Sequence, residues 1–233
     1  MRLVCVPAGN FLMGSSVEGL EAAANEKPQH TVYLDPFWID KTNVTNAQYA
    51  LCVASGSCRI PMSKKSSIHD SYFGNASFQN FPVTSVTWDD AYRYCAWAYR
   101  RLPSEAEWEK AARGADGRLY PWGNSVPDDH LLNFNTSLND TSAVCQYLGG
   151  NSPYGVCDMA GNVWQWIGDW YDGKDYAAAL TTNPNGPTTG SYMVFRGSQW
   201  GRPTWAERSA IRRWRPMGLW SYNLGFRCAA LAL

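Results

Sequence analysis

Residues 195–227 read FRGSQWGRPTWAERSAIRRWRPMGLWSYNLGFR. This segment holds four of the twelve Trp, one Tyr and seven Arg, beside a single acidic residue, Glu207. Each of these three residue types combines a flat contact surface with a polar group, which makes them frequent in binding hot spots. Positions 201–222 lack the period of 2 or 3.6 that core strands and helices show. The pattern therefore favours surface loops with a binding role over the alternative, aromatic residues packed in a core.

The whole chain is neutral and rich in turn-forming residues. Its 233 residues carry 20 Lys and Arg against 20 Asp and Glu, with 20 Gly and 13 Pro. We find no repeat and no shift in composition that divides it, so we expect a single domain over residues 1–233. The neutral balance argues against a nucleic-acid partner, which needs a broad basic surface, whereas the Arg surplus of residues 195–227 favours an acidic partner.

Hydropathy bears on location and assembly. No apolar run approaches the ~20 residues that span a bilayer, and no secretory apolar region follows Met1. We therefore expect a soluble chain without membrane insertion, in a compartment that the sequence leaves open. We expect a monomer.

The seven Cys and three His indicate disulfides rather than a metal site. Cys52 and Cys58 bracket the short loop VASGS, which makes a local disulfide plausible in an oxidising compartment. His30, His69 and His130 are scattered, and no pair of Cys has zinc-ligand spacing.

Three helices are marked by their caps. Thr45 precedes NAQYALCVA, Thr87 precedes WDDAYRYCAWAYR, and Ser104 with Glu107 forms a capping box before a helix that Gly114 ends. On the second helix we expect one shared face, formed by Trp88, Ala91, Tyr92, Cys95 and Ala98. We interpret the carboxylates of the last two helices as caps and solvated charge rather than acid/base catalysts; they are Asp89, Asp90, Glu105, Glu107 and Glu109.

Alternating apolar residues predict the strands. Residues 3–13 form two strands around a turn at Pro7, and residues 30–45 form a second strand pair broken at Asp35 and Pro36. Further strands are expected at VCQYL (144–148) and SYMVFRG (191–197).

Taken in order, eight motifs resemble a known family. They are VPAGNFLMGS, FWIDKTNVTNAQY, FPVTSVTWDDAYRYCAW, RLPSEAEWEKAARG, YPWGN, YGVCDMAGNVWQW, FRGSQW and NLGFRCAA. The chain resembles a formylglycine-generating-enzyme-type (sulfatase-modifying factor) domain, a variant of the C-type lectin fold. The resemblance implies an α+β fold with two main helices, small antiparallel sheets and much irregular loop, and a disulfide between Cys95 and Cys228.

The same resemblance bears on catalysis. The family's oxidases hold copper on two Cys that follow the RGGSW-like turn, and Cu(I) prefers thiolate ligands. Residues 195–227 contain no Cys, so we expect a chain that is not an enzyme, holds no copper and requires no cofactor. An oxidase of sulfatase cysteines and a regulatory module fused to another domain remain as alternatives.

Calcium is a further expectation from the family. Its enzymes bind calcium at two loops through oxygen ligands that include backbone carbonyls. In this chain Gln165 stands where the family usually has Glu, which removes one charge. The matching positions are Asn133, Phe134, Asp158, Gly161, Val163 and Gln165.

Residues 195–227, hereafter the tail, are also similar to the variable region of proteins diversified by retroelements, over about residues 196–227. In those proteins an adenine-directed copying process substitutes some positions while a framework stays constant. The framework here is Arg196, Gly197, Trp200, Arg208, Ser209, Ala210, Arg212, Pro216 and residues 223–227. The predicted ligand-binding positions between them are Gly201, Arg202, Trp205, Arg213, Trp214, Arg215, Met217, Gly218, Leu219, Trp220, Ser221 and Tyr222. The partner that this resemblance implies is a macromolecule, a protein or a glycan.

Overall fold

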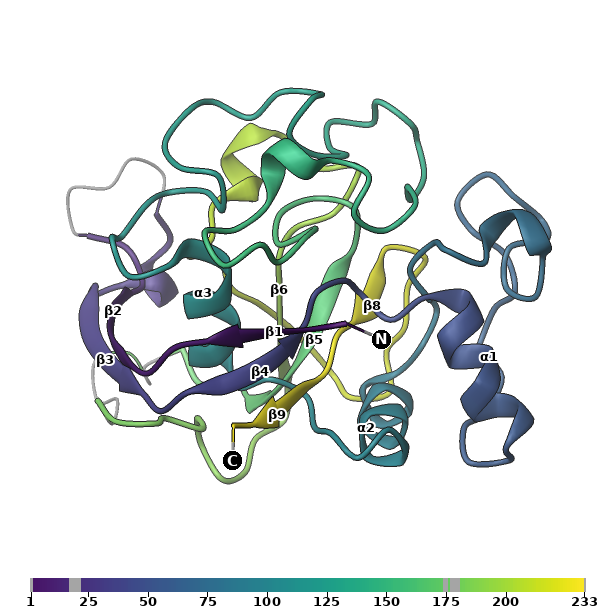
Figure 1. Cartoon of the computed structure of the whole chain (residues 1–233), viewed down its shortest axis with the longest axis horizontal. Helices are drawn as coiled ribbons and strands as arrows, with labels where there is room; N and C mark the ends of the chain where they lie inside the picture. The colour runs from purple at the N-terminus through teal and green to yellow at the C-terminus, as the bar shows by residue number, and fades with distance from the viewer. Residues whose placement is uncertain (1, 17–21, 174–175, 177–180, 233) are drawn as a thin grey trace.

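The computed structural model describes residues 2–16, 22–173, 176 and 181–232. They form a mixed α+β structure with long loops (Figure 1). The helices are α1 (Asn46–Ala54), α2 (Trp88–Trp97) and α3 (Glu105–Arg113). The strands are β1 (Leu3–Val6), β2 (Gly9–Met13), β3 (His30–Leu34), β4 (Phe37–Asp40), β5 (Trp164–Trp170), β6 (Met193–Arg196), β7 (Arg213–Arg215), β8 (Leu224–Phe226) and β9 (Ala229–Leu231).

The four-stranded sheet, in the order β7-β6-β5-β8, separates two apolar clusters. Met193 and Phe195 of β6 contribute to a cluster with α1 and α2, whereas Val194 between them joins a cluster with α3. This alternation follows from the period of two in a strand. Helices α2 and α3 accordingly lie on opposite sides of the sheet (Figure 1). The antiparallel pairing predicted for the sheets holds except between β5 and β8, which run parallel.

The first four strands form one long ladder that two prolines interrupt. Val6 faces Phe37 on one side of the break, and Gly9 faces Leu34 on the other, in the same register. Pro7 and Pro36 occupy the break, and neither carries the N–H that a ladder needs. The strands of residues 30–40 are as predicted, but β3 and β4 do not pair with each other, because each continues the ladder with β2 or β1. Strand β9 pairs with β4 on the side opposite to β1, so β4 is the central strand of a three-stranded sheet.

The three predicted helix caps are present. Thr45, Thr87 and Ser104 each accept a hydrogen bond from the backbone N–H three residues later, and each forms a capping box. Helix α1 is as long as α3, so a third helix accompanies the two that the resemblance implies. The predicted face of α2 is wrong at Tyr92, which is 50% exposed and stacks on Trp88, while Tyr94 enters the core.

Three disulfides cross the structure. The bridges Cys52–Cys58 and Cys95–Cys228 are present as expected. A third, Cys145–Cys157, was not predicted, and it lies where a strand was expected at 144–148. That strand is absent: Cys145 has a φ of 62° and residues Leu148–Gly150 form a 3-10 turn, so the backbone is not extended there. Cys5 is a free, exposed thiol.

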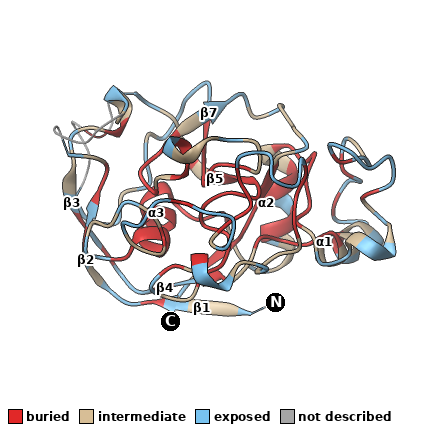
Figure 2. Cartoon of the chain, turned by 90° about the horizontal axis from the view of Figure 1, so that it is seen from above, coloured by how far each residue is buried: buried red, intermediate tan, exposed pale blue. Residues whose placement is uncertain are grey.

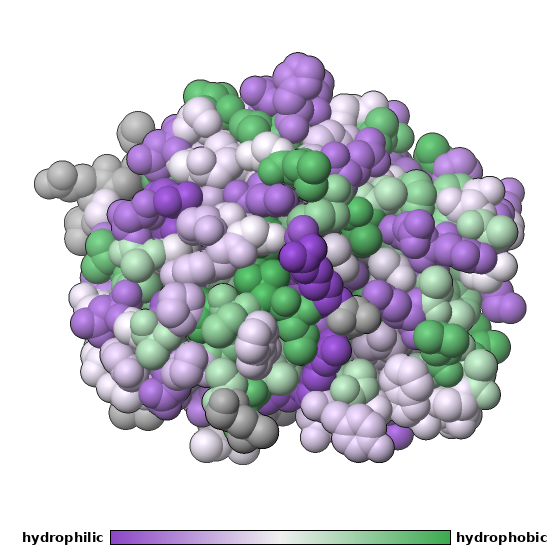
Figure 3. Space-filling view, viewed as in Figure 1, coloured by the Kyte–Doolittle hydropathy of each residue, from purple (hydrophilic) through white to green (hydrophobic). Residues whose placement is uncertain are grey.

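The outer surface is mixed in polarity. On the face shown in Figure 3, apolar and polar residues alternate in small patches, without one broad apolar area. Among the described residues, no helix is long and apolar enough to cross a bilayer. Figure 2 shows that the buried residues gather around β5, α2 and α3, with exposed loops outside them.

Candidate functional site

Burial varies along the tail, and the predicted framework is not buried throughout: Pro216 is exposed, while Trp200, Arg208 and Asn223 are half-buried. None of the twelve predicted ligand-binding positions is buried, and Trp205, Trp214 and Tyr222 each expose about two fifths of their surface. Residues 209–212 and 224–228, in contrast, are buried throughout. The exposed positions thus alternate with short anchored segments along one stretch of chain.

Buried arginines anchor these segments to α3. Arg212 forms two hydrogen bonds to Glu105, from Nε at 2.7 Å and from Nη2 at 2.6 Å. Arg196 contacts both Glu105 and Glu109. Arg196, Arg212, Glu105 and Glu109 all lie in the interior. Each charge therefore has a partner of opposite sign, which a buried ion requires.

Glu107 forms the predicted capping box with Ser104, but the expectation that the glutamates of α3 are solvated is wrong. Glu105, Glu107 and Glu109 are all buried. Each meets an arginine: Glu107 pairs with Arg101 and Glu109 also pairs with Arg113. Burial raises the pKa of Glu109, but Arg196 and Arg113 outweigh it and hold that pKa below its usual value.

A glycine sets the entry into the tail. Gly197 has a φ of 96°, a conformation that side chains rarely adopt. A Cβ there would lie 2.9 Å from Nε2 of Gln165 and 2.9 Å from Cζ2 of Trp108. At this point Arg196 belongs to the buried ion network, and the backbone of Gly197 approaches Trp108 of α3 closely.

The expected calcium loops differ in what they offer to a metal ion. Gln165 Oε1 accepts from Trp108 Nε1 at 2.8 Å and from Arg227 Nε at 2.7 Å, while Gln165 Nε2 donates to the Asp158 carbonyl at 2.8 Å. Its side chain is therefore fully engaged. The Gln165 side chain is not available to a calcium ion in the manner that the resemblance implies, whereas calcium at Asp158, Gly161 and Val163 stays a prediction.

The guanidinium of Arg227 occupies many of the backbone oxygen atoms around Gln165. Arg227 donates to the carbonyls of Asp40, Lys41, Cys157 and Asp158 as well as to Gln165. Burial lowers its pKa to about 10, although the charges of Asp158 and Asp40 oppose this change. Arg227 thus fills this carbonyl-rich position with its own positive charge.

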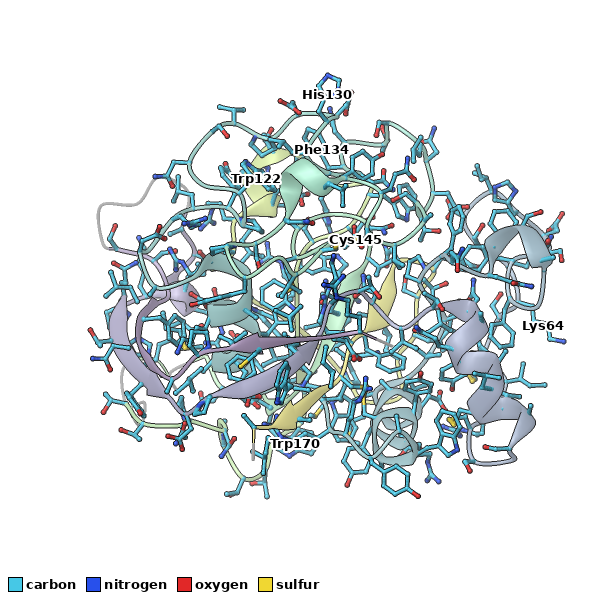
Figure 4. The ribbon with its side chains drawn as sticks, in the orientation of Figure 1. Lys64, Trp122, His130, Phe134, Cys145 and Trp170 are labelled. Carbon is cyan, nitrogen blue, oxygen red and sulfur yellow. A yellow bond between two sulfur atoms is a disulfide. The ribbon has the colours of Figure 1, made fainter. Side chains whose placement is uncertain are left out.

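The predicted calcium loop at Asn133 and Phe134 contains one buried oxygen atom without a hydrogen-bond partner in the described part of the chain. Asn133 donates from Nδ2 to the Asp140 carbonyl, and its buried Oδ1 has no hydrogen-bond partner among the described residues. The Phe134 carbonyl accepts from both N and Oγ of Ser137. In Figure 4 Phe134 and Trp122 lie close together above Cys145, in a small third apolar cluster. Calcium at Asn133 stays a prediction.

The acidic residue of the tail is withdrawn from the surface. Glu207 is buried, and its Oε1 accepts from Ser198 Oγ at 2.7 Å, whereas Oε2 has no partner among the described residues. Burial raises its pKa well above the usual value. Glu207 therefore does not neutralise the surface arginines around it, which the sequence alone did not indicate.

Three tail arginines remain without a carboxylate. Arg208 pairs with Glu26 and Arg212 with Glu105. Across the described part of the chain, Arg202, Arg213 and Arg215 form no ion pair. Partial burial lowers the pKa of Arg213, and the like charges of Arg202 and Arg208 add to this shift while Glu26 opposes it.

Strand β7 places three predicted positions on the sheet. Trp214 stacks on Tyr171, with ring centroids 4.1 Å apart and planes inclined by 9°. The guanidinium of Arg212 also contacts the Tyr171 ring, with its Cζ 5.2 Å from the ring centroid. Tyr171 lies outside the tail, and no signal in the sequence identified it as a support for this surface.

The other predicted positions lie on either side of β7. Toward the start, Asn135 N donates to the Arg202 carbonyl, so residues 201–202 lie beside the 133–136 loop. Toward the end, the Met217 and Ser221 carbonyls accept from Trp88 N and Ser85 N at the start of α2. Trp220 and Tyr222 contact each other edge to face. The twelve positions thus lie beside several different elements of the fold.

Known proteins resemble this chain over most of its length. The sequence profile of a family described as the sulfatase-modifying factor enzyme 1-like domain matches residues 1–232. The formylglycine-generating enzyme of Streptomyces coelicolor is 32% identical over 286 residues, covering 97% of this chain and 88% of that protein. The serine/threonine-protein kinase pkn1 of Chlamydia pneumoniae is 36% identical, covering 98% of this chain but only 38% of that protein.

Solved structures share the architecture. PvdO from Pseudomonas aeruginosa superposes with a TM-score of 0.83 at 25% identity, over 99% of this chain and 94% of that one. Treponema denticola variable protein 1 superposes with a TM-score of 0.80 at 21% identity, over 99% of this chain and 95% of that one. Both confirm the predicted α+β, C-type lectin-like fold.

Proposed function

The chain belongs to the sulfatase-modifying factor enzyme 1-like family, and from this premise we propose that it is a ligand-binding protein rather than an enzyme. In this proposal the twelve accessible tail positions form a binding surface for a macromolecule, and a retroelement diversifies them. The observation that carries the proposal is the burial pattern: all twelve positions are accessible, while the segments between them are anchored through Arg196, Arg212 and Arg227.

This arrangement supplies stability away from the variable positions. Three disulfides and two apolar clusters stabilise the fold, and among the twelve positions Met217 packs against one of the clusters. Substitutions at accessible positions usually change stability by only ~0.5 kcal/mol. Exposed Trp and Tyr, together with Arg, contribute large contact areas at a small entropic cost, as they do in antibody paratopes.

The absence of tail cysteines supports the non-catalytic reading. Residues 195–227 hold no thiolate pair, and the acid that the tail does contain, Glu207, is buried. The match to part of the pkn1 protein of C. pneumoniae favours a second candidate, a recognition module joined to another domain. That candidate is compatible with ligand binding and differs from it only in what the binding controls.

Two experiments test the proposal. The DNA beside the coding region should contain a near-copy of the tail segment with adenines at the variable codons, and a reverse transcriptase gene. A library randomised at the twelve positions should remain largely folded and should yield binders when displayed against unrelated proteins and glycans. A protein that converts cysteine to formylglycine in a sulfatase peptide, with or without added copper, would overturn the proposal.

A further inference from the structure

Strand β7 is an open edge of the four-stranded sheet. It pairs with β6 on one side, and none of the remaining described strands pairs with it on the other. Figure 2 places β7 at the rim of the molecule. An edge strand presents backbone N–H and C=O groups that can accept a further strand from another chain.

The side chains of β7 divide between the two faces of the sheet. Arg213 pairs with Phe195 and Arg215 with Met193, so both arginines share one face. Trp214 pairs with Val194 and takes the other face, where it stacks on Tyr171. The two guanidinium groups thus leave the backbone two residues apart, about 6.6 to 6.8 Å along the strand.

The charge of this edge is only partly balanced from within. Neither Arg213 nor Arg215 forms an ion pair with a described residue, although Arg213 Nη1 donates to the Arg212 carbonyl. The carboxylate that acts on Arg213, Glu26, is paired with Arg208, and Arg202 adds a like charge near Arg213. Glu207 is buried and cannot neutralise them. The same charges disfavour a second copy of this chain on the edge, because β7 against β7 would bring arginines together.

We propose that β7 accepts an extended acidic segment of a partner protein as an additional strand. Carboxylates at positions i and i+2 of that segment pair with Arg213 and Arg215, and an apolar residue between them packs against Trp214. Backbone pairing supplies affinity, and the alternating side chains supply specificity. This inference rests on the proposed function, since it uses three of the predicted ligand-binding positions, and it names the chemistry of the partner.

The test uses labelled synthetic peptides and the whole chain. The probe carries the alternating core Thr-Glu-Val-Glu-Thr, and fluorescence anisotropy follows its binding at low and high salt. Two matched peptides serve as controls: one has the same composition with its two Glu adjacent, and the other has N-methylated alternate amides. We expect the probe alone to bind, with an affinity that falls as salt rises.

Charge reversal then locates the site. We expect Arg213→Glu with Arg215→Glu to bind the probe at least roughly tenfold more weakly and to bind instead a Thr-Lys-Val-Lys-Thr peptide. This exchange of preference requires a folded variant, so it excludes misfolding as the cause. The control Arg2→Glu with Arg93→Glu reverses two exposed charges away from β7 and should leave binding of the probe unchanged.

Other results overturn the inference. Equal binding of the probe and the N-methylated peptide would exclude strand addition. If the probe does not bind, the arginines serve instead to prevent the edge strand from pairing with other chains. A dimer that disappears in the charge-reversed variant would assign the edge to a second copy of this chain. In each case the library of the twelve positions can still yield binders, so failure here is distinct from failure of the proposed function.

Discussion

Trp214 and Tyr171 stack face to face across 4.1 Å, although one lies in the tail and the other follows β5. This contact holds an accessible indole in a fixed orientation before any ligand arrives. Because Arg212 lies against the same Tyr171 ring, the exposed surface is connected to the buried ion network through a single aromatic side chain.

We expect the two rings to be energetically coupled. A double-mutant cycle with Trp214→Ala and Tyr171→Ala should give a coupling of about 0.5 to 1.5 kcal/mol in the free energy of unfolding, as for other aromatic pairs. Denaturant titration of the four proteins measures it. Purely additive effects would mean that the stack contributes nothing to stability.

Removal of one buried charge should be costly. Glu105→Gln leaves Arg212 without its carboxylate in the interior, and breaking such a pair costs about 3 to 5 kcal/mol. The control is Asp89→Asn, which removes a charge from partly exposed pairs with Arg59 and Arg93 and should cost much less. Equal effects of the two substitutions on denaturant midpoints would contradict the assigned role of Glu105.

Stability should depend on pH through Asp40. Burial raises the pKa of this carboxyl from 3.8 to about 6, although Arg100 opposes the shift. The folded state therefore binds a proton that the unfolded state releases, and this contribution to the free energy of unfolding falls as pH rises from about 4 to 6. Denaturant titrations of the natural chain and Asp40→Asn across this range should show a declining difference; a rising difference would reverse the sign.

Substitution of a tail tryptophan should lower the free energy of unfolding less than substitution of a core tryptophan. Trp205→Ser is expected to change the free energy of unfolding by about 0.5 kcal/mol, because Trp205 is 41% exposed. Trp166→Ala removes a fully buried indole between the sheet and α2 and should cost about 3 to 5 kcal/mol. Thermal and chemical denaturation compare the two. A large loss from Trp205→Ser would place that side chain in the framework.

One thiol should remain reactive. Of the seven Cys, only Cys5 is unpaired, and it is exposed. Titration of the oxidised protein with a thiol reagent should therefore give one equivalent without denaturant. Three equivalents would show that one of the three disulfides is open, and peptide mapping without reduction would identify which.

Local signals in the sequence predicted much of the fold. The caps at Thr45, Thr87 and Ser104 act within a few residues, and the paired breaks at Pro7 and Pro36 follow from the lack of an N–H. The missed features are contacts between distant segments. Arg196 meets Glu109 from 87 residues away, and a helix with alternating Glu looks the same in sequence whether arginines or water cover it.

The candidate site shows the same limit. Most residues of the predicted framework are buried and none of the twelve predicted binding positions is, but Pro216 of the framework is exposed. The framework gave no indication of Tyr171, because a support that lies outside the tail leaves no pattern within it. The engagement of Gln165 by Trp108 and Arg227 was equally hidden, since each partner is far away in sequence.

The arginine anchors also determine how this surface is able to vary. Arg196, Arg208, Arg212 and Arg227 each fix one point of the tail: Arg196 and Arg212 to Glu105, Arg208 to Glu26 and Arg227 to backbone carbonyls such as that of Asp40. Antibody loops gain variety by growing or shrinking, but an inserted residue here would pull an anchor from its carboxylate or carbonyls. The tail can therefore accept substitutions at its accessible positions but not insertions or deletions. Copying with base substitution produces this kind of variation.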